Sequence, residues 1–137
     1  MNDYLKKTLL KKYDKILLVI STSLIISSIL LGAFGSHILK DILEIKYMDI
    51  YNIAIKYHFY NTLSLFILNI FYILLKLRII FISNIILLIG SIIFSGSLYL
   101  LVYTKLSFWG MITPIGGVLL VIAWITFLIG VIKYKNR

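Results

Sequence analysis

The sequence predicts an all-α membrane protein in which four transmembrane helices form an antiparallel bundle. Of its 137 residues, 61% are hydrophobic and 14% are charged, whereas about a quarter of the residues of an ordinary soluble domain are charged. The charged residues divide the chain into four apolar runs, at residues 16–39, 57–75, 79–104 and 106–132. Each run is long enough to cross about 30 Å of hydrocarbon, which takes roughly 20 helical residues.

The apolar runs are expected to be helices and not strands. They lack the two-residue alternation of a membrane barrel strand, and an α-helix satisfies all of its backbone groups internally. We expect a basic cytoplasmic tail at residues 1–15 and a single domain at residues 16–137. Within it, the predicted helices cover residues 16–39, 51–75, 79–103 and 114–132.

The connections between the helices have recognisable signals. The turn at residues 76–78 is very short, so the second and third helices are expected to be antiparallel neighbours. Residues 40–49 alternate charges with isoleucines at helical spacing, which predicts a short helix lying in the membrane interface. Thr113 precedes Pro114, the one proline of the chain, as an N-cap precedes the first helical residue, so the fourth helix is expected to begin at Pro114.

The distribution of positive charge predicts the orientation. Ten Lys and Arg residues lie on the side of the two termini and four on the other side, which places both termini in the cytoplasm and the chain in the inner (plasma) membrane. The net charge of +9 is explained by cations at the helix ends, so the expected partner is the lipid bilayer and not nucleic acid. The first run is too long for a signal peptide, and we expect it to be retained.

Small residues follow one face of several predicted helices and indicate where neighbouring helices approach. Without side-chain bulk, two membrane helices can pack closely. We expect the first and third helices to be in contact through these residues, and the fourth helix to present a seam that repeats every seven residues. The predicted packing residues are Ser28, Gly32 and Ser36 in the first helix, Gly96 in the third, and Gly116, Ala123 and Gly130 in the fourth.

Polar side chains from all four helices are predicted to lie at one level, in the outer leaflet. They form a candidate polar cluster of His37, His58, Asn61, Ser97, Tyr99 and Thr113. Polar groups become functional candidates when they face the interior of a membrane bundle. We therefore expect His37 to face inward and to hydrogen-bond to another member of the cluster.

The composition favours a non-enzymatic structural or binding membrane protein with no cofactor. No set of nucleophile, base and orienting residue is visible. The chain has no cysteine, and His37 and His58 alone are too few for a closed metal site. An oligomeric transporter or pore for small solutes or ions is the alternative, although the four runs contain no Asp or Glu to couple protons. A second copy of the chain or another membrane protein would then be the partner.

Four segments together resemble a known family. They read GAFGSHILK, IKYHFYNTLSLF, FSGSLYLL and ITPIGGVLL, the last followed by Trp124. In this order and spacing they are similar to domain of unknown function 423, also called uncharacterised protein family 0382. The resemblance covers the chain after residue 15 and implies a small multi-pass membrane protein, in bacteria of the inner membrane, with no activity to carry over. The family commonly has histidine where this chain has Asn61, and glutamine at the position of His58.

Overall fold

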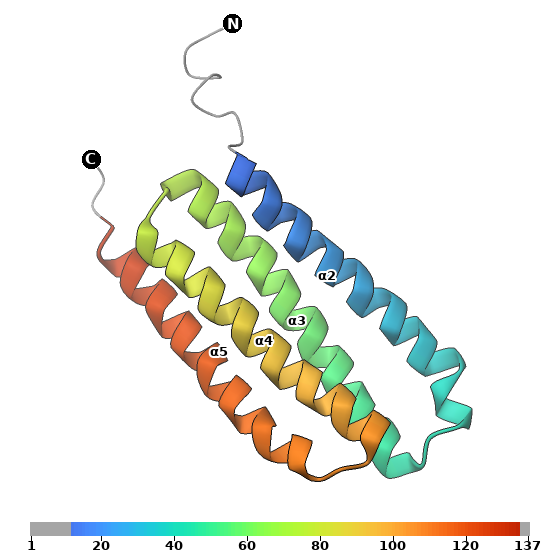
Figure 1. The fold of residues 1–137 in the computed structure, drawn as a ribbon. Coiled ribbons are helices and arrows are strands. Elements are labelled where there is room, and N and C mark those ends of the chain that lie inside the picture. The colour runs from blue at the N-terminus through green and yellow to red at the C-terminus, as the bar shows by residue number, and fades with distance from the viewer. Residues whose placement is uncertain (1–11, 135–137) are drawn as a thin grey trace, which may run out of the picture.

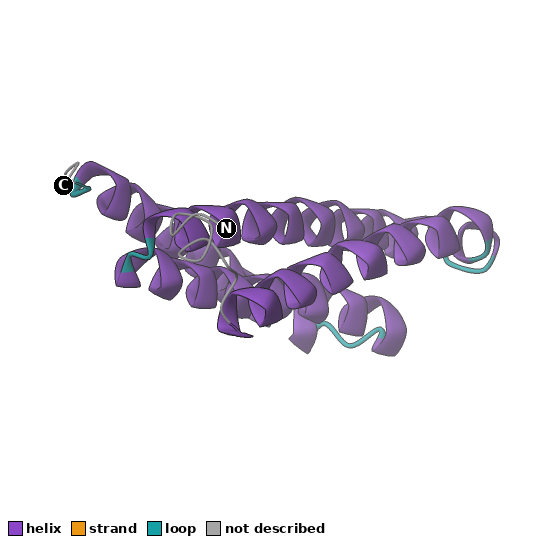
Figure 2. Ribbon diagram, turned by 90° about the horizontal axis from the view of Figure 1, so that it is seen from above, coloured by secondary structure: helices purple, strands orange, loops and turns teal. Residues whose placement is uncertain are grey.

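The computed structural model describes residues 12–134, and these residues form helices joined by short loops, without a strand (Figure 2). The four long helices are α2 (Lys12–His37), α3 (Ile45–Leu75), α4 (Arg78–Thr104) and α5 (Phe108–Ile132), with a short 3-10 helix, η1 (Leu39–Asp41), after α2. All four long helices are long and apolar enough to cross a membrane. The prediction of four apolar helices is therefore confirmed. Most of the predicted basic tail, residues 1–11, lies outside the described part of the chain.

Helices α2 to α5 run alternately in opposite directions (Figure 1). The described termini and the turn between α3 and α4 lie at one end, which we call the termini end. Helix η1 and the loop between α4 and α5 lie at the other, which we call the loop end. Neither name depends on the orientation of the protein in the membrane.

The expected separate interfacial helix at residues 40–49 is not found. The structure has a three-residue 3-10 turn there, and α3 begins at Ile45. The backbone N–H groups of Tyr47 and Met48 both donate to the carbonyl of Glu44, so the chain is already helical at this point. Composition placed the helix start at residue 51 because charged residues precede it, but helical hydrogen bonding continues beyond the apolar run.

The predicted start of the fourth helix at Pro114 is wrong, since α5 begins at Phe108 and contains Pro114. Thr113 is therefore not an N-cap. Its hydroxyl donates to the carbonyl of Trp109 at 3.4 Å and lies 2.7 Å from the hydroxyl of Ser97 on α4. A proline inside a helix loses one backbone hydrogen bond, and membrane helices tolerate this loss where neighbouring groups compensate.

Each long helix packs along the next one in the sequence, α2 on α3, α3 on α4 and α4 on α5 (Figure 1). The expectation that the first and third helices pack closely is therefore wrong. The small residues of α2 face α3 instead: a Cβ added to Gly32 would lie 3.5 Å from Ile55, and one added to Gly35 would overlap the ring of Tyr51. Because this face of α2 packs on α3, α2 does not pack along α4.

The closest helix contact joins α4 and α5 along the seven-residue seam of α5. A Cβ on Gly116 would meet the backbone of Phe94 at 2.5 Å, and one on Gly130 would meet Ile79 at 2.8 Å. Between them, Ala123 is fully buried, and its carbonyl accepts a hydrogen bond from Ser83 at 2.7 Å. The seam therefore brings α5 almost to backbone contact with α4.

An ion pair joins neighbouring helices at each end of the molecule. At the termini end, Lys76 Nζ lies 2.6 Å from the carboxylate of Asp14, whose side chain is 4% exposed. At the loop end, Lys105 Nζ lies 3.0 Å from Glu44, and both side chains are exposed. Both lysines end their helices in the left-handed conformation, with φ of 52° and 58°. These two pairs differ mainly in burial.

Candidate functional site

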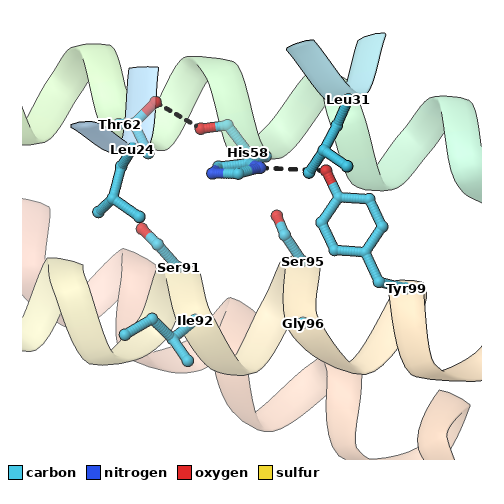
Figure 3. Close-up of a pocket in the computed structure, with 9 residues that line it drawn as sticks. All are labelled: Leu24, Leu31, His58, Thr62, Ser91, Ile92, Ser95, Gly96 and Tyr99. Carbon is cyan, nitrogen blue, oxygen red and sulfur yellow. Dashed lines mark hydrogen bonds between the residues drawn. The ribbon is translucent and has the colours of Figure 1, made fainter. Parts of the chain in front are cut away.

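A groove of about 270 Å³ lies between α2 and α4, with α3 beside it (Figure 3). We call it the His58 groove. Its lining residues are Leu24 and Leu31 from α2, His58 and Thr62 from α3, and Ser91, Ile92, Ser95, Gly96 and Tyr99 from α4. The groove exists because α2 packs on α3 and leaves this face of α4 without a partner helix. Ile92 is 59% exposed, so the groove opens at the surface of the helices.

His58 is hydrogen-bonded to side chains of two other helices. Its Nδ1 lies 3.1 Å from the hydroxyl of Tyr99 on α4, as the dashed line in Figure 3 shows. Its Nε2 lies 3.4 Å from the hydroxyl of Ser27 on α2. A neutral imidazole has one donor and one acceptor nitrogen, and hydroxyl groups match either role. His58 therefore links α2, α3 and α4 through neutral hydrogen bonds.

Among the buried serines of α4, Ser95 differs from the others because its hydroxyl makes no hydrogen bond with the described residues. The hydroxyls of Ser91 and Ser97 donate to carbonyls of their own helix, and that of Ser83 donates to α5. Ser95 is 3% exposed, and its Oγ has no hydrogen-bond partner among the described residues. In Figure 3 this hydroxyl points from α4 toward His58 and Tyr99. A hydroxyl without a hydrogen bond among the described residues therefore lies covered next to the groove.

Tyr51 supports the loop end of the groove. Its hydroxyl donates to the carbonyl of Leu31 on α2 at 2.8 Å, and its ring lies edge-on to that of Tyr99 at 5.7 Å. Sequence reasoning did not include Tyr51 in the site. A signal was present, because Tyr51 precedes His58 by seven residues, which places both on one face of a helix.

The structure separates the residues of the predicted polar cluster into groups. His58 and Tyr99 are together in the groove, whereas Ser97 and Thr113 form a separate pair, 2.7 Å apart, between α4 and α5. Asn61 is buried on α3, and its Nδ2 has no hydrogen-bond partner in the described chain. The four helices therefore do not supply one continuous cluster.

The expectation that His37 faces inward is wrong. Its side chain is exposed, and it makes no hydrogen bond with the described residues. The physical reason is helical geometry. Ser21, Ser28 and Gly35 mark the buried face of α2, and His37 follows Gly35 by two residues, a rotation of about 200° that turns it to the opposite face.

The chemistry of the groove is that of neutral hydrogen-bonding groups on apolar walls. No Asp, Glu, Lys or Arg lines it. In residues 12–134, no group of three or more His, Asp or Glu side chains is arranged to hold a metal ion. The imidazole of His58 and the hydroxyl of Ser95 belong to residues that line the groove, but the surface that the groove exposes is apolar.

The four apolar helices define a small multi-pass membrane protein, and the groove between them is lined by no Asp, Glu, Lys or Arg. A family model described as "Protein of unknown function (DUF423)" matches residues 31–117, and the chain belongs to this family. The resemblance seen in the sequence is confirmed.

Curated relatives agree with the family assignment. The chain is 36% identical over 109 residues to UPF0382 membrane protein YwdK of Bacillus subtilis, which covers 76% of this chain and 85% of the relative. It is 33% identical over 110 residues to UPF0382 inner membrane protein YgdD of Escherichia coli K12. This match covers 78% of this chain and 82% of the relative. For UPF0382 membrane protein SH2409 of Staphylococcus haemolyticus, the identity is 32% over 120 residues, and the match covers 88% of this chain and 98% of the relative. No solved structure matches the chain.

Proposed function

We propose that this chain is a non-enzymatic membrane protein that binds a small lipid-soluble molecule in the His58 groove. The observation that carries the proposal is the Ser95 hydroxyl, which has no partner among the described residues, is covered, and points toward His58 and Tyr99 beside the groove (Figure 3). A buried hydroxyl without a hydrogen bond costs about 1–3 kcal/mol. Serines in membrane helices ordinarily avoid this cost by bonding to a carbonyl one turn earlier.

The surroundings of Ser95 favour a ligand over simple packing. Gly96 lines the groove, and a Cβ added there would meet nothing within 4 Å, so the groove has free space one residue from Ser95. The walls contributed by Leu24, Leu31 and Ile92 are apolar. Space, apolar walls and a few convergent polar groups are the usual features of a small-molecule site.

The contacts of His58 support binding without catalysis. Both of its ring nitrogens are already within hydrogen-bonding distance of a hydroxyl, from Tyr99 and Ser27. Proton transfer to a ligand would require breaking one of these contacts, and no carboxylate lines the groove to orient the imidazole. We therefore assign His58 a structural role, in which its hydrogen bonds connect α3 to α2 and to α4.

A substitution at Gly96 tests the proposal. We expect Gly96→Leu to fill the groove and to leave the fold intact, since the added side chain enters free space. The probe is a diazirine-bearing benzyl alcohol, which is neutral and lipid-soluble, added to the full chain in liposomes. Mass spectrometry of the photolabelled peptides should show the label concentrated on residues 91–99 in the original protein. In Gly96→Leu this labelling should fall to the level of the exposed face of α5.

Ala33→Leu is the matched control, because Ala33 is exposed on α2 and does not line the groove. It should leave the labelling of residues 91–99 unchanged. Equal labelling of every lipid-facing surface, with no effect of Gly96→Leu, would refute the proposed function.

We also propose that the termini end faces the cytoplasm and that the protein lies in the inner (plasma) membrane. The termini end, where the described termini and the α3–α4 turn lie, contains five cations: Lys12, Lys15, Lys76, Arg78 and Lys133 (Figure 1). Cytoplasmic loops carry an excess of Lys and Arg. A reporter that is active only after export, fused after the C-terminus, should therefore be inactive, while one that is active only in the cytoplasm should be active. The reverse result would overturn the orientation.

A further inference from the structure

We propose further, on the basis of the proposed function, that the ligand is a neutral single-tailed lipid. Its head carries a carbonyl oxygen that accepts a hydrogen bond from Ser95, and its tail lies toward the loop end. The first observation is a second groove of about 620 Å³ at the loop end, which shares Leu31 and Tyr99 with the His58 groove. The two spaces are therefore adjacent along the same face of α4.

The smaller space suits the head. The Ser95 hydroxyl has an O–H to donate and no acceptor among the described residues, so the matching group on the ligand is an oxygen acceptor. The oxygen of Ser95 is covered in the free protein. A ligand therefore reaches it by displacing half-buried side chains of the wall. Of these, Leu24 and Leu31 belong to α2, whose apolar stretch has the smallest buried share of the four long helices.

The head is neutral because the groove has no group to compensate a charge. No ionisable side chain other than His58 and Tyr99 lines the His58 groove. An ion placed at this depth without a partner is strongly unfavourable. The cation that lines the second groove, Lys105, is already paired with Glu44 at 3.0 Å. This argues against an anionic headgroup at the loop end.

The larger space suits a tail. Its walls include Phe34, Ile42, Leu43 and Val102, which are apolar side chains from α2, the connecting segment and α4. Ser95 and Lys105 are ten residues apart on α4, which corresponds to about 15 Å along the helix axis. We assign a single alkyl chain to this path, which passes Leu31 and Tyr99, the residues that line both spaces.

Competition against the diazirine probe tests this inference on the full chain in liposomes. The competitors are tridecan-2-one, which has a tail and a carbonyl, tridecane, which has the tail alone, and butanone, which has the carbonyl with almost no tail. Tridecan-2-one should displace the label from residues 91–99 at a concentration about fivefold lower than tridecane, the ratio expected for one hydrogen bond. Butanone should be weaker than tridecan-2-one.

Two serine variants separate recognition from folding. Ser95→Ala should remove the difference between tridecan-2-one and tridecane, without lowering the unfolding temperature of the free protein, because its hydroxyl has no partner to lose among the described residues. Ser91→Ala, in the same groove, should keep the difference, since Ser91 already donates to Leu87.

The outcomes distinguish this inference from the proposed function. Equal competition by the ketone and the alkane, unchanged by Ser95→Ala, would overturn the assignment of the head while the groove remains a binding site. Labelling of residues 91–99 that none of the three compounds displaces would overturn the tailed ligand and leave the proposed function standing. Failure of the probe to label the groove at all would overturn both.

Discussion

Gly116→Ala is expected to lower the free energy of unfolding by about 3 kcal/mol, at the upper end of the usual range for overpacking a tight interface. A Cβ at this position would lie 2.5 Å from the backbone nitrogen of Phe94 and 2.7 Å from its Cα. These are backbone atoms of α4, so no side-chain rotation relieves the overlap. The two helices must separate, and the hydrogen bond between Ser97 and Thr113 one turn away is lost with them.

Gly96→Ala is the matched control on the facing helix. A Cβ at Gly96 would meet nothing within 4 Å, and alanine is the better helix former by about 1 kcal/mol. We therefore expect this variant to be as stable as the original protein or slightly more stable. Unfolding of both variants in detergent, followed by the loss of helical circular dichroism, gives the comparison. Similar unfolding temperatures for the two would show that α5 does not pack on α4 through Gly116.

The four helices were predictable because crossing a membrane is a property of length and composition, and both are visible in the sequence. The ends of the helices were less predictable. The charges at Lys46 and Asp49 suggested that α3 begins later than Ile45, yet the backbone remains helical where the side chains have become polar. The start of α5 was wrongly predicted at Pro114 because proline is common at the first helical position but is not restricted to it.

The pairing of helices could not be deduced from spacing alone. Of the small residues predicted to pack in α2, Ser28 is buried and Gly32 half-buried, whereas Ser36 is exposed and Gly35, which was not predicted, is buried. Spacing does not say which neighbour covers the buried face of α2, and the structure assigns α3 and not α4. The consequence for the site is large, since the separation of α2 from α4 is what creates the groove.

The candidate site was only partly visible for the same reason. His58 and Tyr99 were selected as polar residues at one level, and the structure places them 3.1 Å apart. His37 was selected by the same argument, but its side chain points away from the bundle. The position of a residue along a helix axis does not determine which face of the helix it occupies. Ser95 was unremarkable in the sequence. Its importance comes from the absence of a partner among the described residues, which only the arrangement of neighbouring side chains reveals.

Asp14→Ala is expected to destabilise the protein by about 2 kcal/mol, whereas Glu44→Ala should change its stability by less than about 0.5 kcal/mol. Both substitutions remove the acidic member of a lysine pair that joins two helices, one at each end of the molecule. The Asp14 carboxylate is 4% exposed and lies 2.6 Å from Lys76, whereas the Glu44 side chain is 69% exposed and lies 3.0 Å from Lys105. Only the Asp14–Lys76 pair has a member, Asp14, that is shielded from water.

The expected magnitude follows from the burial of each partner. Breaking a fully buried ion pair costs about 3–5 kcal/mol because a charge is left without compensation. The Lys76 side chain is 42% exposed, so water solvates it after the loss of Asp14, and the cost is smaller. Asp14 also lies in the first turn of α2, where a negative charge interacts favourably with the helix dipole.

The measurement is the free energy of unfolding of Asp14→Ala, Lys76→Ala and the double variant, with the corresponding three variants of Glu44 and Lys105. The coupling energy of the pair at the termini end should exceed that of the pair at the loop end by more than 1 kcal/mol, about the largest value usual for exposed pairs. Equal coupling at the two ends would mean that the Asp14–Lys76 pair does not hold α2 against the turn between α3 and α4. In that case α2 would be retained by its other contacts with α3, which include the packing of Gly35 on the Tyr51 ring and the hydrogen bonds from Asn69 to Leu17 and Ser21.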